Sequence, residues 1–374
     1  MSNNASFIIK LNRRSKKTIL SCGGQLKNTF SVAKGNSLYV SPAFGDLDRL
    51  ENYQNYTSFI EKFFKENAIK PDLVAFDLHP DYLSTKYAHS LNVSEEVGVQ
   101  HHHAHLASFL VETKTEGKAI GVTFDGTGLG LDGNIWGGEF LVGDLNGFER
   151  KAHLKYVSMP GGEQAIKEPW RMAVSWLYQI YGRDFLDLRI KFVDEIDRSK
   201  WAILNKMIDS KINSPSTSSM GRLFDAVSSL IGVREKIEYE AQAAIELERI
   251  ADKGVCDFYK FKIGSEDGIY LIDPSDIFMS IVEDLKGKIA VSVISARFHN
   301  AVCRMINEVC IKLRDSLGTE QVVLSGGVFL NEYLIEKVRP LLVSNGFELL
   351  QNDRISVGDS GISVGQALIA GGGS

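Results

Sequence analysis

The sequence predicts a two-lobed α/β fold with a nucleotide-binding cleft between the lobes. Two blocks of short β-type segments, one near the N-terminus and one starting near residue 119, each lead into helical segments, so the chain is duplicated in outline. A length of 374 residues suits one large two-lobed unit or two ordinary domains. Glycine is enriched (34 residues) and proline is scarce (8 residues), which is typical of compact proteins with tight turns or with backbone lying against a ligand.

The first block combines short strands with amphipathic helices. Four β-type runs separated by turn residues predict a meander: Ser6–Ile9, Thr18–Ser21, Thr29–Val32 and Ser37–Val40. Helical spacing of apolar residues predicts a helix over Tyr56–Asn67, and a short apolar run predicts a strand over Asp72–Phe76. Further helices are expected over Ser84–Ser90 and His101–Glu112.

The second block begins with three predicted strands: Ala119–Phe124, Ile135–Val142 and Arg150–Tyr156. A mostly helical region, Glu168–Ile250, follows and is broken by polar residues at Ser214–Ser219. The remaining expected elements are a strand pair (Phe258–Ile263, Gly268–Ile272), a long helix (Val293–Leu317), and two strand–helix units (Gln321–Leu324 with Asn331–Val343, and 348–350 with Ser360–Ile369).

These elements predict two lobes. Residues 1–117 form the first lobe, and residues 352–370 are a candidate segment to return to it. Residues 118–351 form the second lobe, with a helical insertion at about 165–250. Residues 371–374 are expected to be a flexible tail.

Composition and motifs exclude several classes of protein. The net charge of −5 argues against a broad nucleic-acid-binding surface. The four cysteines form no Cys-x-x-Cys pair, so a cysteine zinc site is not expected. No apolar run has the length of a membrane span or of a signal peptide, and we expect a cytoplasmic protein. No Walker loop, Rossmann fingerprint, Gly-x-Ser-x-Gly elbow or protein-kinase motif set occurs.

A histidine cluster is the sharpest candidate for chemistry. Four of the eight histidines lie within the five positions of His101-His102-His103-Ala104-His105. On a helix, His101 and His105 share one face, so both imidazoles can reach one metal ion. Because Leu106 and other apolar residues follow at once, we favour this interpretation over a solvated polar tract.

Three glycine-rich turns accompany polar residues. Asp125 precedes Gly126-Thr127-Gly128, a pattern typical of a carboxylate that holds a cation beside a phosphate-binding turn, although an ordinary β-turn fits equally well. Ser325-Gly326-Gly327 ends a strand before Asn331. Its glycines would let a nucleotide lie against the backbone, or they serve only a tightly packed turn between strand and helix.

Asp359 lies in the third turn, where it caps a helix or completes a metal shell. Two histidines and two aspartates would suit Fe(II) or Zn(II).

Three basic residues are candidates for binding a phosphate or a carbonyl oxygen. Lys167 and Arg171 stand four residues apart, and Lys27 follows Gly23-Gly24. Exposed charges at a helix start explain the first pair equally well.

Together these motifs resemble the carbamoyltransferase domain of the HypF family, and more distantly the tRNA threonylcarbamoyl transferases and the antibiotic O-carbamoyltransferases. The resemblance spans residues 20–370 and implies the actin-like fold. Six further strings are HypF-like: Gly24–Phe30, Gly45–Leu47, Asp77–Pro80, Glu168–Ala173, Gly221–Val227 and Ala296–Asn300.

The resemblance implies roles for individual residues. His101, His105, Asp125 and Asp359 match the metal ligands, and the ion is expected to be Fe or Zn, with Mg as an option alongside the nucleotide. The positions that match nucleotide-binding backbone or side chains are Gly126, Thr127, Gly128, Gly138, Asp225, Ser325, Gly326, Gly327 and Asn331. Lys27 and Arg171 are candidates to hold the carbamoyl oxygen, and His102, His103 and His79 are candidates to accept the thiol proton.

The implied reaction moves the carbamoyl group of carbamoyl-adenylate, formed from ATP, to the C-terminal cysteine thiol of HypE during [NiFe]-hydrogenase maturation. The acylphosphatase, zinc-finger and YrdC-like domains of HypF have no counterpart in this sequence. We therefore expect the transfer half-reaction alone, either from an excised C-terminal domain or from a stand-alone transferase that receives the adenylate from a separate YrdC-like partner. No nucleic-acid or membrane partner is expected.

Three other functions remain open. A stand-alone O-carbamoyltransferase would use a small-molecule hydroxyl, an actin-like kinase or ATPase would release ADP, and a scaffold would only bind nucleotide.

Overall fold

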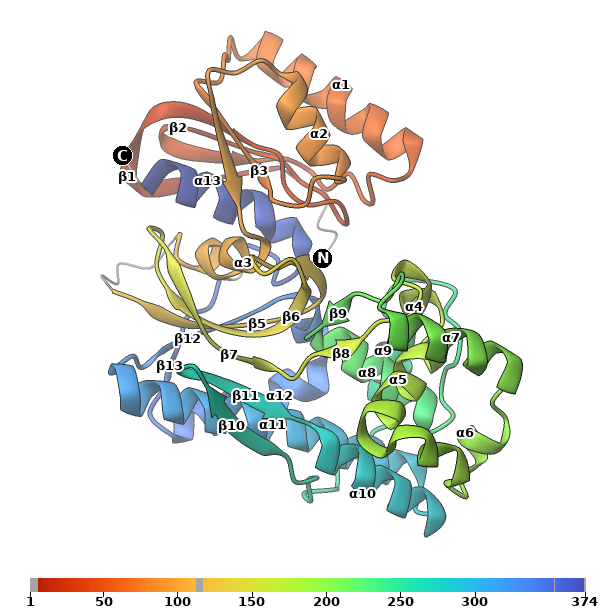
Figure 1. The fold of residues 1–374 in the computed structure, drawn as a ribbon. Coiled ribbons are helices and arrows are strands. Elements are labelled where there is room, and N and C mark those ends of the chain that lie inside the picture. The colour runs from red at the N-terminus through yellow and green to blue at the C-terminus, as the bar shows by residue number, and fades with distance from the viewer. Residues whose placement is uncertain (1–5, 112–116, 353, 373–374) are drawn as a thin grey trace.

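The computed structural model describes residues 6–111, 117–352 and 354–372, which fold around two β-sheets. Figure 1 shows one sheet in the upper part of the molecule and the other in the middle, with a helical layer beneath and a helical group to the right. Within the described ranges, no helix combines the length and the apolar character needed to cross a membrane.

The first sheet has the strand order β2-β1-β3-β4. Its strands are β1 (Phe7–Ser21), β2 (Ser31–Val40), β3 (Leu73–Asp77) and β4 (Glu95–Val99). The accompanying helices are α1 (Leu50–Glu66) and α2 (Leu83–Ser90). The predicted four-stranded meander is wrong, because register shifts in the β1–β2 pairing let two long strands replace four short ones. Strand β4 was not predicted.

Alternation along the strands buries both faces of this sheet. Ile19 belongs to a core that includes Ile362 of the C-terminal helix, and its neighbour Leu20 belongs to a core that includes Tyr56 of α1. Figure 1 accordingly shows α1 and α13 on opposite sides of the sheet.

The second sheet has the order β10-β11-β7-β6-β5-β12-β13. Its strands are β5 (Ala119–Leu129), β6 (Ile135–Gly143), β7 (Phe148–Leu154), β10 (Lys262–Glu266), β11 (Ile269–Asp273), β12 (Gln321–Ser325) and β13 (Glu348–Leu349). The short strands β8 (Val157–Ser158) and β9 (Ser216–Thr217) pair beside β6. The helices beneath the sheet are α10 (Ser275–Lys286), α11 (Val291–Leu317) and α12 (Glu332–Ser344).

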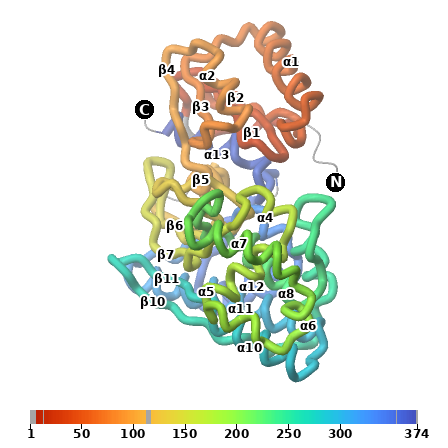
Figure 2. Tube along the Cα trace, turned by 45° about the vertical axis from the view of Figure 1, so that its right-hand side comes forward, coloured from red at the N-terminus to blue at the C-terminus, as the bar shows by residue number. Residues whose placement is uncertain are grey.

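The helical group follows β8 in the chain and stands apart from the first sheet in both views (Figures 1 and 2). It contains α4 (Glu163–Lys167), α5 (Trp170–Tyr181), the 3-10 helix η1 (Gly182–Asp187), α6 (Lys191–Asp194), α7 (Arg198–Ser210), α8 (Met220–Leu230) and α9 (Gln242–Arg249). Lys167 ends α4, and Arg171 lies on α5. The two residues therefore belong to different helices, since Pro169 precedes the first residue of α5.

Helices α3 (His101–Phe109) and α13 (Ile362–Gly372) lie between the two sheets. Ala104 shares a core with the first sheet, whereas Leu106 shares one with the second. The two helices approach closely at Gly365, where a Cβ atom would lie 1.9 Å from the carbonyl oxygen of Ala104. This close approach fixes the histidine-bearing helix against the C-terminal one.

The C-terminal segment packs beside the first sheet, since α13 contacts β1, β2 and β3. The expectation of a tail starting at residue 371 is wrong for Gly371 and Gly372, which belong to α13 because this apolar helix continues along β1. Residues 373–374 lie outside the described part of the chain. The predicted division at residues 117/118 falls between the two sheets and stays a prediction.

Candidate metal centre

Four side chains that the sequence placed far apart converge on one point. His101 and His105 project from the same face of α3, Asp125 lies on β5, and Asp359 begins the 3-10 helix η3 (Asp359–Gly361). One potential ligand atom from each residue lies within 4.8 Å of the others. The His105 Nε2 atom is 2.9 Å from Asp125 Oδ2 and 3.8 Å from Asp359 Oδ1. The donor set of two imidazoles and two carboxylates suits Fe(II) or Zn(II).

Hydrogen bonds on the far side of both rings direct the Nε2 atoms inward. The Nδ1 atom of His101 is 2.7 Å from Asp77 Oδ2, and Nδ1 of His105 is 3.1 Å from the hydroxyl of Ser325. Since Ser325 donates its own proton to the Val357 carbonyl, it accepts from His105. Each imidazole therefore carries hydrogen on Nδ1 and presents the Nε2 lone pair that a metal requires.

The His101 ring supplies the observation that tests the fit of a metal. Its Nε2 atom is buried and has no hydrogen-bond partner among the described residues. A buried polar atom without a partner is costly, and a cation between the two histidines and Asp125 would satisfy it.

Replacing Asp77 by asparagine is expected to weaken metal binding about 10- to 100-fold, because the charged partner that orients His101 is lost while the ligands remain. Competition with a chromophoric zinc chelator measures this affinity. Asp81→Asn is the matched control, since Asp81 is exposed and pairs with Lys86. An unchanged affinity in Asp77→Asn would contradict the orienting role.

The pKa values of three of these ligands are shifted strongly from their ordinary values. Burial alone would lower the pKa of His101, but Asp77 and Asp125 raise it well above the ordinary value. Burial would raise the pKa of Asp125, but the adjacent imidazoles of His101 and His105 lower it well below the ordinary value. Burial and the charge of Asp125 raise the pKa of Asp359 to about 8. Two carboxylates held this close require a cation to be ionised together.

The glycine-rich segment after Asp125, which we expected to be a turn, belongs to β5 at an irregularity in its pairing with β6, and it packs directly against the histidine helix. A Cβ atom on Gly128 would lie 2.5 Å from Cε1 of His102 and 2.9 Å from Cδ2 of His101. The Gly126 amide donates to Asp125 Oδ1. At Gly138, by contrast, a Cβ atom would meet the Ser218 carbonyl oxygen at 2.4 Å, so close protein packing accounts for this glycine.

The predicted nucleotide turn lies on the other side of Asp125. Gly326 has φ +103°, a conformation that favours glycine, and a Cβ atom on Gly327 would lie 3.1 Å from Asp125 Oδ1. The Asn331 side chain caps α12 by accepting from the Leu334 amide, and its amide nitrogen is 3.1 Å from His299 Nε2. In this structure Asn331 is therefore engaged as a helix cap.

Asp225 is buried on α8 and pairs with Arg222 at 2.8 Å. Burial raises its pKa to about 6, although Arg222 opposes the shift. Arg222 in turn lies close to Gly126, since a Cβ atom there would be 3.7 Å from Arg222 Nη2. This pair therefore borders the turn that follows the metal centre.

Two models of one protein family together match most of the chain. The HypF Kae1-like domain model matches residues 14–112, and the model described as the second subdomain of the Kae1-like carbamoyltransferase domain matches residues 121–366. The chain belongs to the HypF carbamoyltransferase family.

Relatives place the chain within that family. Carbamoyltransferase HypF of Synechocystis sp. is 34% identical over 382 residues, which cover 96% of this chain and 48% of the relative. A carbamoyltransferase HypF homolog of Cupriavidus necator is 32% identical over 366 residues, covering 94% of this chain and 91% of the homolog. Apart from such shorter homologs, the chain spans about half the length of the HypF relatives it matches.

Two solved structures confirm the predicted two-lobed, actin-like α/β fold class. Full-length HypF in a phosphate- and nucleotide-bound form is similar with a TM-score of 0.93 and 43% identity, covering 98% of this chain and 47% of that one. HypF of T. kodakarensis is similar with a TM-score of 0.87 and 33% identity, covering 98% and 49%.

The other predicted site residues of this HypF-family chain lie in different parts of the structure. His102 is buried beside the metal centre, and its Nδ1 is 3.2 Å from the Gln100 amide nitrogen. His79 stacks on Tyr82 with ring centroids 4.2 Å apart. Arg171 bonds to Glu168 within the helical group, and no contact places it at the metal centre among the described residues.

Three residues near the centre had no role assigned from the sequence. Asp77 lies within one of the HypF-like strings, and its position at the end of a buried strand is the sequence signal that could have identified it as a site residue. Tyr82 lies near the acidic groups of the centre, since burial and the charges of Asp77, Asp359 and Asp125 raise its pKa well above the ordinary value. Glu240 pairs with Lys27 across a large sequence separation, which no local pattern indicates.

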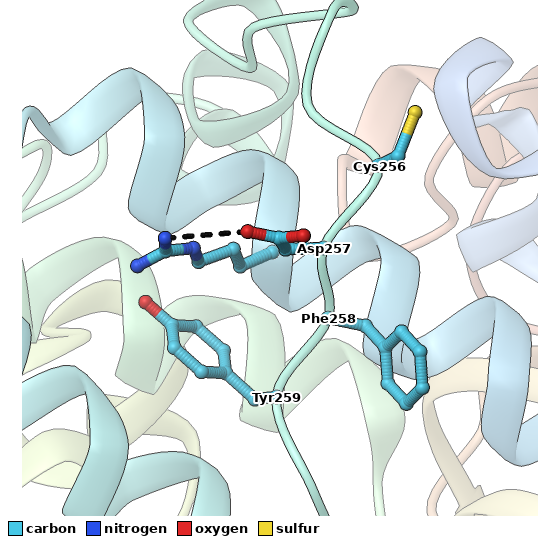
Figure 3. Close-up of a pocket in the computed structure, with 5 residues that line it drawn as sticks. Cys256, Asp257, Phe258 and Tyr259 are labelled. Carbon is cyan, nitrogen blue, oxygen red and sulfur yellow. Dashed lines mark ion pairs between the residues drawn. The ribbon is translucent and has the colours of Figure 1, made fainter.

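An open pocket of about 400 Å³ lies away from these residues (Figure 3). Cys256, Asp257, Phe258, Tyr259 and Arg297 line it. Figure 3 shows Asp257 and Tyr259 on one side of the backbone, with Cys256 and Phe258 pointing the other way. Arg297 pairs with Asp257 at 3.5 Å. None of the predicted site residues lines this pocket.

Proposed function

We propose that this chain transfers the carbamoyl group of carbamoyl-adenylate to the C-terminal cysteine thiol of a HypE-like acceptor protein. The observation that carries the proposal is the buried group of His101, His105, Asp125 and Asp359 in a member of the carbamoyltransferase HypF family. The solved HypF with phosphate and nucleotide supports a phosphorylated ligand at this centre.

In the proposed reaction, the acceptor sulfur forms a bond to the carbamoyl carbon. The bond from that carbon to the phosphate oxygen of adenylate breaks, and AMP leaves with the electron pair. The thiol proton passes to solvent. Because the mixed anhydride is already activated, the chain has mainly to bind and orient the two reactants.

The four ligands would hold one divalent ion, which when bound supplies Lewis-acid stabilisation of phosphate charge. The ammonium of Lys27 supplies a further positive charge, since Asp359 and Asp125 lie within its electrostatic reach. The Gly126–Gly128 segment of β5 and the Gly327 backbone border Asp125 and are the proposed phosphate-binding backbone.

His102 contributes as a hydrogen-bond donor in this proposal, in place of the proton acceptor we expected. Its Nδ1 accepts from Gln100, so the hydrogen stands on Nε2, which is buried without a partner among the described residues. Burial and the neighbouring His101 and His105 lower its pKa well below the ordinary value, which makes it a weak base.

The chain's own cysteines do not supply a covalent intermediate in this proposal. Burial raises the pKa of Cys22 and of Cys303 to about 12, so both remain neutral thiols near neutral pH. We therefore propose direct transfer to the acceptor thiol. A YrdC-like adenylating domain provides the carbamoyl-adenylate from carbamoyl phosphate and ATP.

Mass spectrometry of the acceptor tests the proposal. The chain is incubated with carbamoyl phosphate, ATP, a purified YrdC-like domain and a HypE-like protein, and we expect the acceptor to gain one carbamoyl group while AMP accumulates. An acceptor whose C-terminal cysteine is replaced by alanine should stay unmodified. Carbamoylation of a small-molecule hydroxyl without modification of the protein thiol would instead identify an O-carbamoyltransferase, and ADP as the product would identify a kinase or an ATPase.

A further inference from the structure

Lys27 and Glu240 connect two parts of the molecule that are distant in sequence. Lys27 lies between β1 and β2 of the first sheet, whereas Glu240 precedes α9 of the helical group. The Lys27 Nζ atom is 3.2 Å from the Glu240 carboxylate. The two side chains are 44% and 46% exposed, whereas His101 and His105 of the metal centre are buried.

The backbone of Lys27 is held in an unusual conformation. Its φ is +43°, a region that non-glycine residues occupy rarely. The Lys27 amide donates to Asp46 Oδ1, and its carbonyl accepts from the hydroxyl of Ser360, the residue after Asp359. A strained residue tied down on both sides is typical of a functional position.

The pair also adjoins the metal centre through the backbone. The hydroxyl of Ser360, the residue after the ligand Asp359, lies 2.8 Å from the carbonyl oxygen of Lys27. A carboxylate at this place repels an incoming anion, and it also pairs with the ammonium group that the anion would otherwise bind.

We propose that the Lys27–Glu240 ion pair is a displaceable latch at the entrance to the metal centre. In the free protein Lys27 pairs with Glu240, and when ligand binds, an anionic group of the ligand replaces Glu240 as the partner of Lys27. The latch rests on the proposed function in one respect, that the ligand of this centre is phosphorylated.

The strength of the pair fits this role. A half-exposed ion pair contributes little to stability, because solvent screens it and two long side chains lose freedom. A phosphate group bound at the metal centre makes a stronger charge-assisted hydrogen bond to the lysine. Ligand binding therefore exchanges a weak contact for a stronger one.

Nucleotide affinity tests the latch. Calorimetric titration with ADP in the presence of zinc is expected to show about threefold to tenfold tighter binding by Glu240→Gln than by the wild type, because the competing carboxylate is gone. Glu238→Gln is the matched control, since it removes the same charge from the same exposed segment and should change the affinity less than twofold. In a Lys27→Met background, Glu240→Gln should have almost no effect. Weaker binding by Glu240→Gln, or equal gains in both backgrounds, would overturn the latch.

The accessibility of Lys27 tests the latch without any nucleotide. Acylation by a water-soluble succinimidyl ester, followed by peptide mass spectrometry, should modify Lys27 about threefold faster in Glu240→Gln than in Glu238→Gln, since the amine is released from its partner. Equal rates would overturn the latch whatever the titration shows. Faster acylation together with no ADP binding by the wild type would instead contradict the phosphorylated ligand of the proposed function.

Discussion

Replacing both His101 and His105 by alanine is expected to remove the metal and to lower carbamoyl transfer about a thousandfold or more. Both imidazoles present Nε2 to the two carboxylates, so the double variant keeps only half of the donor set. Metal content by mass spectrometry and transfer from supplied carbamoyl-adenylate measure the two losses separately.

A matched control for this variant is His103→Ala. His103 belongs to the same helix, but its Nε2 is 2.7 Å from the carbonyl oxygen of Asp144 and its ring packs on Phe148. This control should retain the metal and transfer activity within a few-fold. Thermal unfolding of both variants shows whether the fold is preserved. Full transfer by the folded double variant would refute the assignment of these histidines.

Asp359→Asn is expected to change stability in opposite directions with and without metal. The pKa of Asp359 is raised to about 8, above an unfolded value of about 3.9. Between these two values the native state keeps a proton that the unfolded state has released, so the free energy of unfolding falls as pH rises from about 4 to 8. The asparagine variant lacks this loss, and in chelator it should be more stable than the wild type at pH 9 by about 1–3 kcal/mol.

Saturating metal should reverse that order. A metal that binds only the native state stabilises the wild type according to its affinity, and the variant has lost one of four ligands. Thermal unfolding of both proteins at pH 5 and pH 9, each with chelator and with zinc, measures the four differences. A variant less stable than the wild type in chelator at pH 9 would contradict the buried, repelled carboxylate.

The fold class and most elements could be predicted because they leave local patterns. The long helix predicted over Val293–Leu317 begins only two residues earlier, at Val291, and carries a continuous apolar face. The β1–β2 hairpin was divided wrongly, because lysines, arginines and an asparagine interrupt a strand that register shifts hold together. Strand β4 was missed because the exposed Glu95 and Glu96 hide its parallel pairing with β3.

The four ligands of the metal centre could be predicted from the sequence, but the residues that orient these ligands could not. Helical spacing brings His101 and His105 together, and neighbouring glycines mark Asp125 and Asp359. The orienting roles of Asp77 and Ser325 depend on which elements pack around α3, and that information is not local. The same holds for the Lys27–Glu240 pair, whose members come from different parts of the fold.

The packing of α13 against α3 has a consequence for the order in which the molecule acquires its chemistry. The histidines lie in the first third of the chain, but Asp359 and the helix that fixes their backbone at Gly365 follow only near its end. Contacts between segments so distant in sequence form late and slowly during folding. A partly synthesised chain would expose two histidines and Asp125 without the fourth ligand, so tight metal capture would wait until the last helix has docked.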